Sequence, residues 1–146
     1  MKIKYAFFIF IILICSSCNK AMTPLQSDQN LLDNIIKQTA NLDIGERKDL
    51  NIDIEYESIV VVEPYSTRQI LAKLDIDKNS INQILKTMTK DENYQLFIIN
   101  KGTVTNFVIL PSNLSTENDK SISINSPAKL KIEITTDNNR PYKLFK

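Results

Sequence analysis

The spacing of apolar residues in the first part of the chain changes from a helical to a strand period near residue 50. Ser27 and Asp28 precede the helical run, and either can cap its first turn. The apolar residues of this run recur at intervals of three and four: Leu31, Leu32, Ile35, Ile36 and Ala40. We therefore predict a helix that begins after Ser27 or Asp28 and docks on the core.

Three strand-like segments follow this helix. Residues 50–57 alternate between apolar and polar side chains, which is typical of a strand with one buried and one wet face. Residues 59–62 are all apolar and β-branched, and they predict a strand that is buried on both faces and ends at Pro64. Residues 70–76 alternate again and predict a third strand, although Ile70, Leu71 and Leu74 also fit one face of a helix.

The second half of the chain opens with a short helical pattern and then consists of strands. Residues 79–90 have helical spacing, with Asn79 or Ser80 as the expected cap. Two apolar runs within residues 94–110 surround Lys101-Gly102 and predict a hairpin, because Gly adopts the positive φ of a tight turn. The polar segment 111–120 is the expected mobile loop, and strand patterns follow at residues 121–124, 128–134 and 142–145.

These patterns predict a mainly β fold, an antiparallel β-sandwich-like domain with two short helices. Roughly six to eight strands separated by turn signals, with few helices, favour this class over alternating βαβ units. An α+β fold with one antiparallel sheet is the alternative. A length of 146 residues suits a single domain.

The first twenty residues have the order of an export signal. Lys2 and Lys4 form a basic start, residues 5–15 are apolar, and Ser16-Ser17-Cys18 follow. The apolar run is too short to span a bilayer, which takes roughly 20 residues. This arrangement resembles the type II signal peptide of bacterial lipoproteins, with Cys15 in the place usually held by Leu. The resemblance implies cleavage before Cys18, which would carry a diacylglyceryl thioether and an acylated amino terminus.

The resemblance also implies an organisation and a location. Residues 1–17 would be the signal peptide, residues 18–27 a flexible tether that contains Pro24, and residues 28–146 a single β-rich domain. The lipid would anchor the protein to a membrane of the cell envelope. Asn19, rather than Asp, follows the modified cysteine, which favours the outer membrane, facing the periplasm, in a Gram-negative cell.

The spacing Cys15-x-x-Cys18 has three other interpretations. A redox pair should open a helix, whereas this pair closes an apolar run. Half of a zinc site would need further Cys or His ligands, and the chain has none. An uncleaved apolar tail packed into the core remains as the third, but large apolar residues behind two lysines suit membrane insertion better.

Composition narrows the chemistry that the chain can perform. With 18 basic and 17 acidic residues, it is not expected to bind nucleic acid. It has no His, the commonest general base and metal ligand, and its two glycines cannot form a phosphate-binding loop. We therefore expect no enzymatic activity, no cofactor, no metal and no nucleotide.

Two motifs outside the N-terminal region suggest chemistry only weakly. Asp75, Asp77 and Asn79 match the opening of a calcium loop, but Ser80 stands where Gly is needed and Lys86 where a bidentate acid is needed. A helix cap is the favoured role for this segment. The Ser-x-x-Lys at residues 126–129 leads into a strand rather than opening a helix, which argues against a Ser/Lys hydrolase.

The remaining candidate is an acidic ladder, by which we mean Asp53, Glu55 and Glu57 on the polar face of the strand predicted at residues 50–57. These carboxylates are a candidate contact for a partner. We expect a lipid-anchored envelope protein with a small protein-binding domain, a component of an envelope or secretion-system assembly whose partner is another envelope protein. A periplasmic inhibitor or immunity lipoprotein, with the ladder or residues 111–120 as its contact, is the alternative. A carboxylate-dependent hydrolase is a third class, which would need two carboxylates in one cleft.

Overall fold

The first of two sheets is wholly antiparallel and has the strand order β4-β3-β2-β6. The computed structural model describes residues 25–146, so Cys18, the expected signal peptide and most of the expected tether lie outside the described residues. The strands of this sheet are β2 (Ser58–Val62), β3 (Gln95–Asn100), β4 (Thr103–Ile109) and β6 (Ile122–Asn125).

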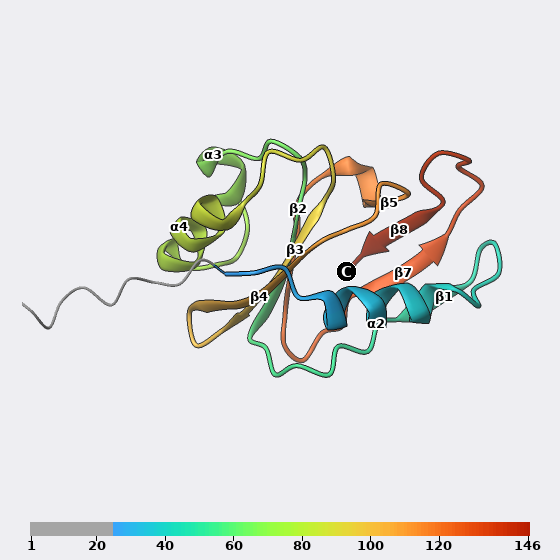
Figure 1. The fold of residues 1–146 in the computed structure, drawn as a ribbon, viewed down its shortest axis with the longest axis horizontal. Helices are drawn as coiled ribbons and strands as arrows, with labels where there is room; N and C mark the ends of the chain where they lie inside the picture. Colours follow the sequence, from blue (N-terminus) through green and yellow to red (C-terminus); the bar gives the residue numbers. More distant parts are fainter. Residues whose placement is uncertain (1–24) are drawn as a thin grey trace, which may run out of the picture.

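The second sheet has the order β1-β7-β8-β5 and contains one parallel pair, β5 with β8. Its strands are β1 (Arg47–Asp49), β5 (Leu114–Thr116), β7 (Lys131–Ile134) and β8 (Tyr142–Phe145). The described helices are α2 (Gln29–Thr39), α3 (Arg68–Leu71), α4 (Lys78–Thr87) and a 3₁₀ turn, η1 (Glu117–Asp119). Figure 1 shows α3 and α4 beside the first sheet, and α2 begins next to β4, where the Asp28 N–H donates to the Phe107 carbonyl at 2.8 Å.

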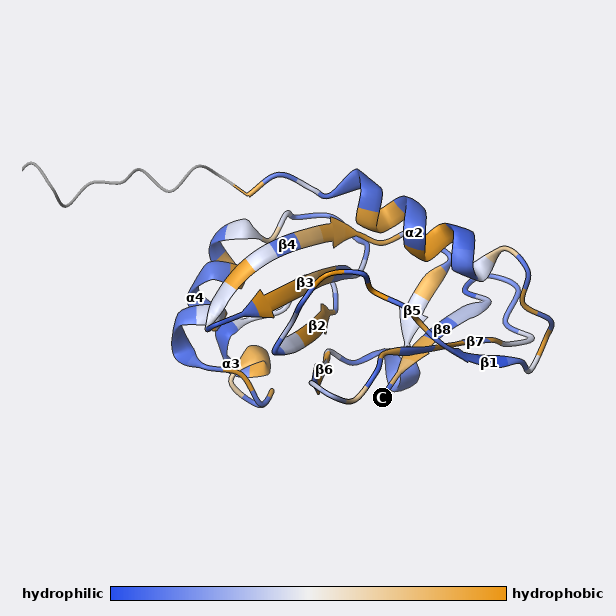
Figure 2. Ribbon diagram, turned by 90° about the horizontal axis from the view of Figure 1, so that it is seen from below, coloured by the Kyte–Doolittle hydropathy of each residue, from blue (hydrophilic) through white to orange (hydrophobic). Residues whose placement is uncertain are grey.

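Two apolar clusters hold these layers together. The larger cluster joins the two sheets and α2, and includes Ile35, Val61, Leu96, Ile132 and Leu144, each at most 1% exposed. Each such side chain contributes roughly 1.5–3 kcal/mol of burial free energy. Figure 2 shows α2 lying across the molecule with its apolar side toward the strands.

The smaller cluster covers the other face of the first sheet. Val60, Val62 and Phe97 point toward Leu71 of α3 and Ile84 of α4, and all five are fully buried. The rings of Phe97 and its cross-strand partner Phe107 stack with centroids 5.8 Å apart. β2 is therefore buried on both faces, as the run of β-branched residues predicts.

The prediction of an antiparallel β-sandwich-like domain with helices is confirmed. The helix capped by Asp28, the hairpin around Lys101-Gly102 and the strands near residues 59–62, 121–124, 128–134 and 142–145 are all present. Both turn residues have positive φ, 50° for Lys101 and 64° for Gly102.

The strand predicted at residues 50–57 is wrong, although its alternation of buried and exposed side chains is correct. Leu50 and Ile52 are buried and Asn51 and Asp53 are exposed, yet the segment belongs to no strand. It carries the chain from β1 in one sheet to β2 in the other, and only its two ends make backbone hydrogen bonds, Leu50 to Leu130 and Glu57 to Ile99 and Ser126. The periodicity reflects a buried face and not a hydrogen-bonded ladder.

Three other predictions need correction. Residues 70–76 form no strand. The helical spacing of their apolar residues is the correct one, because α3 buries Leu71 and is followed by turns. The cap of α4 is Asp77, not Asn79 or Ser80, because its carboxylate accepts the N–H groups of both those residues. The predicted loop at 111–120 contains β5, whose three residues are buried beside β8.

Candidate functional site

The residues of the acidic ladder are exposed and separately engaged. The Glu57 carboxylate accepts the backbone N–H of Gly102 at 3.0 Å, which ties the ladder to the β3–β4 turn. Asp53 accepts the side-chain N–H of its neighbour Asn51 at 2.7 Å. Glu55 has no hydrogen bond or ion pair among the described residues. None of the three lines the open groove described below.

In the calcium-like motif, Asp77 and Asn79 make hydrogen bonds within the domain. Asp77 Oδ1 accepts the N–H groups of Asn79 and Ser80 at 2.8 and 3.0 Å, and Asn79 donates to the carbonyl of Gly102 at 2.9 Å. The Ser80 hydroxyl and these backbone bonds lower the pKa of Asp77. In the part of the chain that the structure describes, no three metal-ligating side chains lie together. The motif caps α4 and links it to the hairpin.

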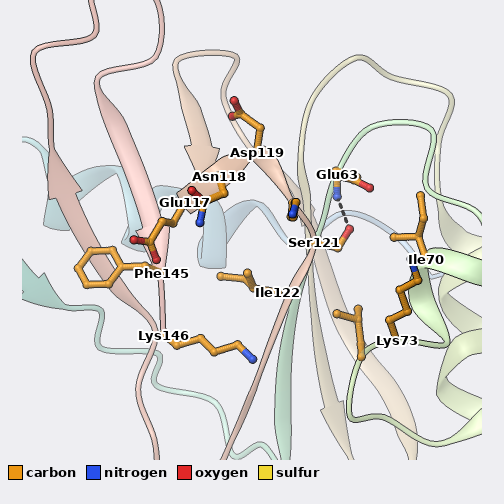
Figure 3. Close-up of a pocket in the computed structure, with 12 residues that line it drawn as sticks. Glu63, Ile70, Lys73, Glu117, Asn118, Asp119, Ser121, Ile122, Phe145 and Lys146 are labelled. Atoms are coloured by element: carbon orange, nitrogen blue, oxygen red, sulfur yellow. Dashed lines mark hydrogen bonds between the residues drawn. The ribbon is translucent and has the colours of Figure 1, made fainter.

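An open groove of about 790 Å³ lies between α3, the start of β6 and the end of β8. We call it the β6 groove. Its apolar floor comes from three segments that are distant in sequence: Ile70 and Leu74 from α3 and the turn after it, Ile122 from β6, and Phe145 from β8. Figure 3 shows Ile122 near its centre, with Phe145 to one side and Ile70 to the other.

Charged side chains of both signs surround this floor. Figure 3 shows Asp119 and Glu63 in the upper part of the view, Glu117 beside Phe145, and Lys73 and Lys146 lower down. Among the described residues, only Asp119 of these five is within ion-pair distance of an opposite charge. Lys120, between Asp119 and Ser121 in the chain, also lines the groove, so the rim carries three acids and three lysines.

The segment that carries two of these acids has an unusual backbone. Asn118 and Asp119 have φ of 59° and 51°, in the left-handed region that costs a non-glycine residue about 1 kcal/mol or more. Tyr65, two residues after Glu63, also has a positive φ of 59° and is 63% exposed. Three of the four described non-glycine residues of this kind thus lie at or near the groove, and the fourth, Lys101, is in the hairpin turn.

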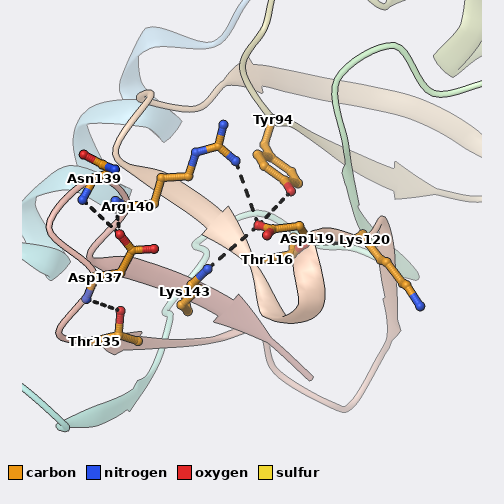
Figure 4. A network of polar contacts seen from close by, with 9 residues as sticks. All are labelled: Tyr94, Thr116, Asp119, Lys120, Thr135, Asp137, Asn139, Arg140 and Lys143. Atoms are coloured by element: carbon orange, nitrogen blue, oxygen red, sulfur yellow. Dashed lines mark hydrogen bonds and ion pairs between the residues drawn. The ribbon is translucent and has the colours of Figure 1, made fainter.

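A network behind the groove holds Asp119 in place (Figure 4). Asp119 Oδ1 accepts the Tyr94 hydroxyl at 3.4 Å and lies 3.8 and 3.9 Å from the charged nitrogens of Lys143 and Arg140. Burial raises the pKa of Tyr94, so its hydroxyl remains a donor. Asp137 accepts the backbone N–H of Arg140 at 3.2 Å, and its backbone hydrogen bonds lower its own pKa. These contacts come from segments next to the groove and hold Asp119 in place on one of its walls.

The other wall is fixed by two serines. The Ser121 hydroxyl accepts the backbone N–H of Glu63 at 2.9 Å and lies 3.1 Å from the hydroxyl of Ser66. These bonds join the start of β6 to the turn after β2 (Figure 3). Glu63 and Ser121 therefore sit side by side at the mouth of the groove.

Sequence reasoning found only part of this site. It named residues 111–120 as a possible contact, and four of them, 117 to 120, line the groove. It missed Glu63, Lys73, Ile122 and Phe145, because only the pairing of β6 with β2 and of β8 with β5 brings these segments together. The polar run after the buried residues of β5 was the available signal.

No protein-family model, no curated protein and no solved structure matches the chain. Within residues 25–146, no helix has the length and apolarity that crossing a membrane requires. We therefore infer function from the geometry of the β6 groove and from the residues of the N-terminal region.

Proposed function

We propose that this chain is a non-enzymatic, lipid-anchored protein of the cell envelope whose domain binds another protein through the β6 groove. The observation that carries the proposal is the composition of the groove: an apolar floor within a charged rim. Protein interfaces commonly combine an apolar centre with a polar rim. The mixture of three acids and three lysines around the floor suits a protein surface better than a polyanion.

The position of the groove also suits an anchored protein. Figure 2 shows the chain entering α2 on one side of the domain, whereas α3, β6 and the end of β8 lie on the opposite side. A lipid on Cys18 is separated from Leu25 by seven residue steps, which reach about 25 Å when extended. Anchored in this way, the domain would turn the β6 groove away from the membrane surface and toward proteins in the adjoining compartment.

Site-specific photo-crosslinking in the producing cell tests this function. A benzoylphenylalanine placed at Lys120, on the rim of the groove, is expected to form adducts with a partner protein, because this exposed side chain lies at the proposed contact. The same group at Glu55, exposed on the acidic ladder, is the matched control and is expected to form none.

The outcomes separate the possible surfaces and roles. Adducts from position 55 alone would move the contact to the acidic ladder and refute the groove. The absence of adducts at both positions would contradict protein binding at either surface. Several envelope proteins crosslinked through position 120 would indicate an assembly component, and a single enzyme would indicate the inhibitor or immunity role.

A further inference from the structure

The start of β6 leaves backbone groups unpaired at the groove. Within residues 25–146, β6 is an edge strand that pairs only with β2, in the register Val61 with Ile122 and Ile59 with Ile124. Ser126 continues this register by donating its N–H to the Glu57 carbonyl at 2.8 Å. Because backbone direction alternates along a strand, Ile122 and Ile124 turn their backbone groups toward β2. The backbone groups of Ser121 and Ser123 therefore point away from the sheet.

These outward groups have no hydrogen-bond partner among the described residues. Ser121 is partly exposed and lines the β6 groove, whereas Ser123 is only 6% exposed. The accessible part of this edge is therefore its N-terminal end, at Ser121. An unpaired edge beside a groove is the arrangement to which extended peptides add as an extra strand.

The side chains around Ser121 specify what such a peptide would carry. Glu63 and Glu117 are carboxylates without a cationic neighbour within 4 Å among the described residues. Glu63 stands beside Ser121, whereas Glu117 lies on the Phe145 side of the groove (Figure 3). Ile122, Ile70 and Phe145 offer an apolar surface next to them. Lys73, on the opposite part of the rim, has no acidic neighbour within 4 Å in the same part of the chain.

We infer that the β6 groove binds an extended peptide segment of its partner, which pairs with β6 at Ser121 and places a basic side chain at Glu63. An aliphatic or aromatic side chain next to that base covers the floor at Ile122. An acidic side chain farther along the segment meets Lys73. This inference rests on the proposed function and adds the chemistry of the partner to it.

Selection from a random twelve-residue peptide library displayed on phage, against the purified full chain in detergent, tests the chemistry. We expect enriched peptides to share a Lys or Arg next to a large apolar residue, with an acid farther along. Affinity of a selected peptide is then measured by fluorescence polarisation. Glu63→Lys and Lys73→Glu should each weaken binding about fivefold, the effect of one exposed charge pair. Glu55→Lys and Lys37→Glu, exposed and outside the groove lining, should leave it unchanged.

N-methylation of the selected peptide, one backbone position at a time, tests the strand pairing. A peptide paired with β6 should lose about tenfold in affinity when a nitrogen facing Ser121 is methylated and much less at the neighbouring positions. Equal tolerance at every position would overturn strand addition. Selected peptides without a shared basic residue, or an unchanged affinity of Glu63→Lys, would overturn the charge assignment.

Failure of this inference is distinguishable from failure of the proposed function. If no peptide is enriched while position 120 still crosslinks in the cell, the partner is recognised as a folded surface and only the peptide inference falls. If neither occurs, the groove is not a binding site and both fall.

Discussion

The carboxylate of Asp77 serves two elements at once. It accepts the first free N–H groups of α4, and it is 3.7 Å from the position that a Cβ on Gly102 would occupy in the β3–β4 turn. Asn79, which it orients, donates to the carbonyl of the same glycine. A residue pattern that resembles a metal loop is thus explained by capping and by the contact between helix and hairpin.

Replacing Asp77 with Ala is expected to lower the free energy of unfolding by about 1 kcal/mol at pH 7, the usual effect of losing an N-cap. Because hydrogen bonds lower the folded-state pKa of Asp77 below 3.8, its ionised form stabilises the fold above the unfolded pKa. That contribution is lost as the pH falls through the folded pKa. The difference between wild type and Asp77→Ala, measured by urea unfolding, should therefore shrink below pH 3.8. Asp77→Asn keeps a capping oxygen and should stay close to wild type at pH 7; a cost that grows in acid would contradict this role.

The turn of the β3–β4 hairpin contains a residue type that is unfavourable for its backbone conformation. Asn100 pairs with Thr103, so Lys101 and Gly102 form a two-residue loop in which both φ angles are positive. Turns of this kind favour Asn-Gly, because Asn tolerates the left-handed region better than Lys does. Lys101 therefore carries strain that the turn does not require.

Replacing Lys101 with Asn should raise the free energy of unfolding by several tenths of a kcal/mol to about 1 kcal/mol, because the left-handed backbone is less costly for Asn. Lys101→Ala is the matched control, since it removes the same exposed amine without that preference. Chemical denaturation of both variants checks the effect. An equal gain in both would show that loss of the charge, and not the backbone, is responsible.

The elements also show which features the sequence could predict. Local patterns predicted α2, the hairpin and β2, whose apolar spacing and turn residues act within a few residues. The same patterns were wrong for residues 50–57, because alternation reports a buried face but not a strand partner. They could not assemble the β6 groove, since Glu63, Ile122 and Phe145 meet only through long-range pairing.

At the scale of the whole molecule, the proposed anchor decides where the groove is presented. Cys18→Ser should release the protein from the membrane fraction and abolish incorporation of labelled palmitate, because the thioether cannot form and acylation follows it. Cys15→Ser is the matched control and should remain in the membrane fraction. Cell fractionation and intact mass measure both. Membrane association and lipid mass that persist in Cys18→Ser would refute the anchor.

The pairing of early strands with late ones sets the order in which the domain can form. β1 pairs with β7, and Arg47 bonds to Glu133 at 2.9 Å across 86 positions of the chain. While the chain is being synthesised, β1 and β2 must wait for β7 and β6 before their edges are covered. β8 comes last and joins β7 to β5. The second sheet therefore closes only after residues 142–145 have emerged, and a chain that stops before Tyr142 would leave β5 without the partner strand that it has in the described structure.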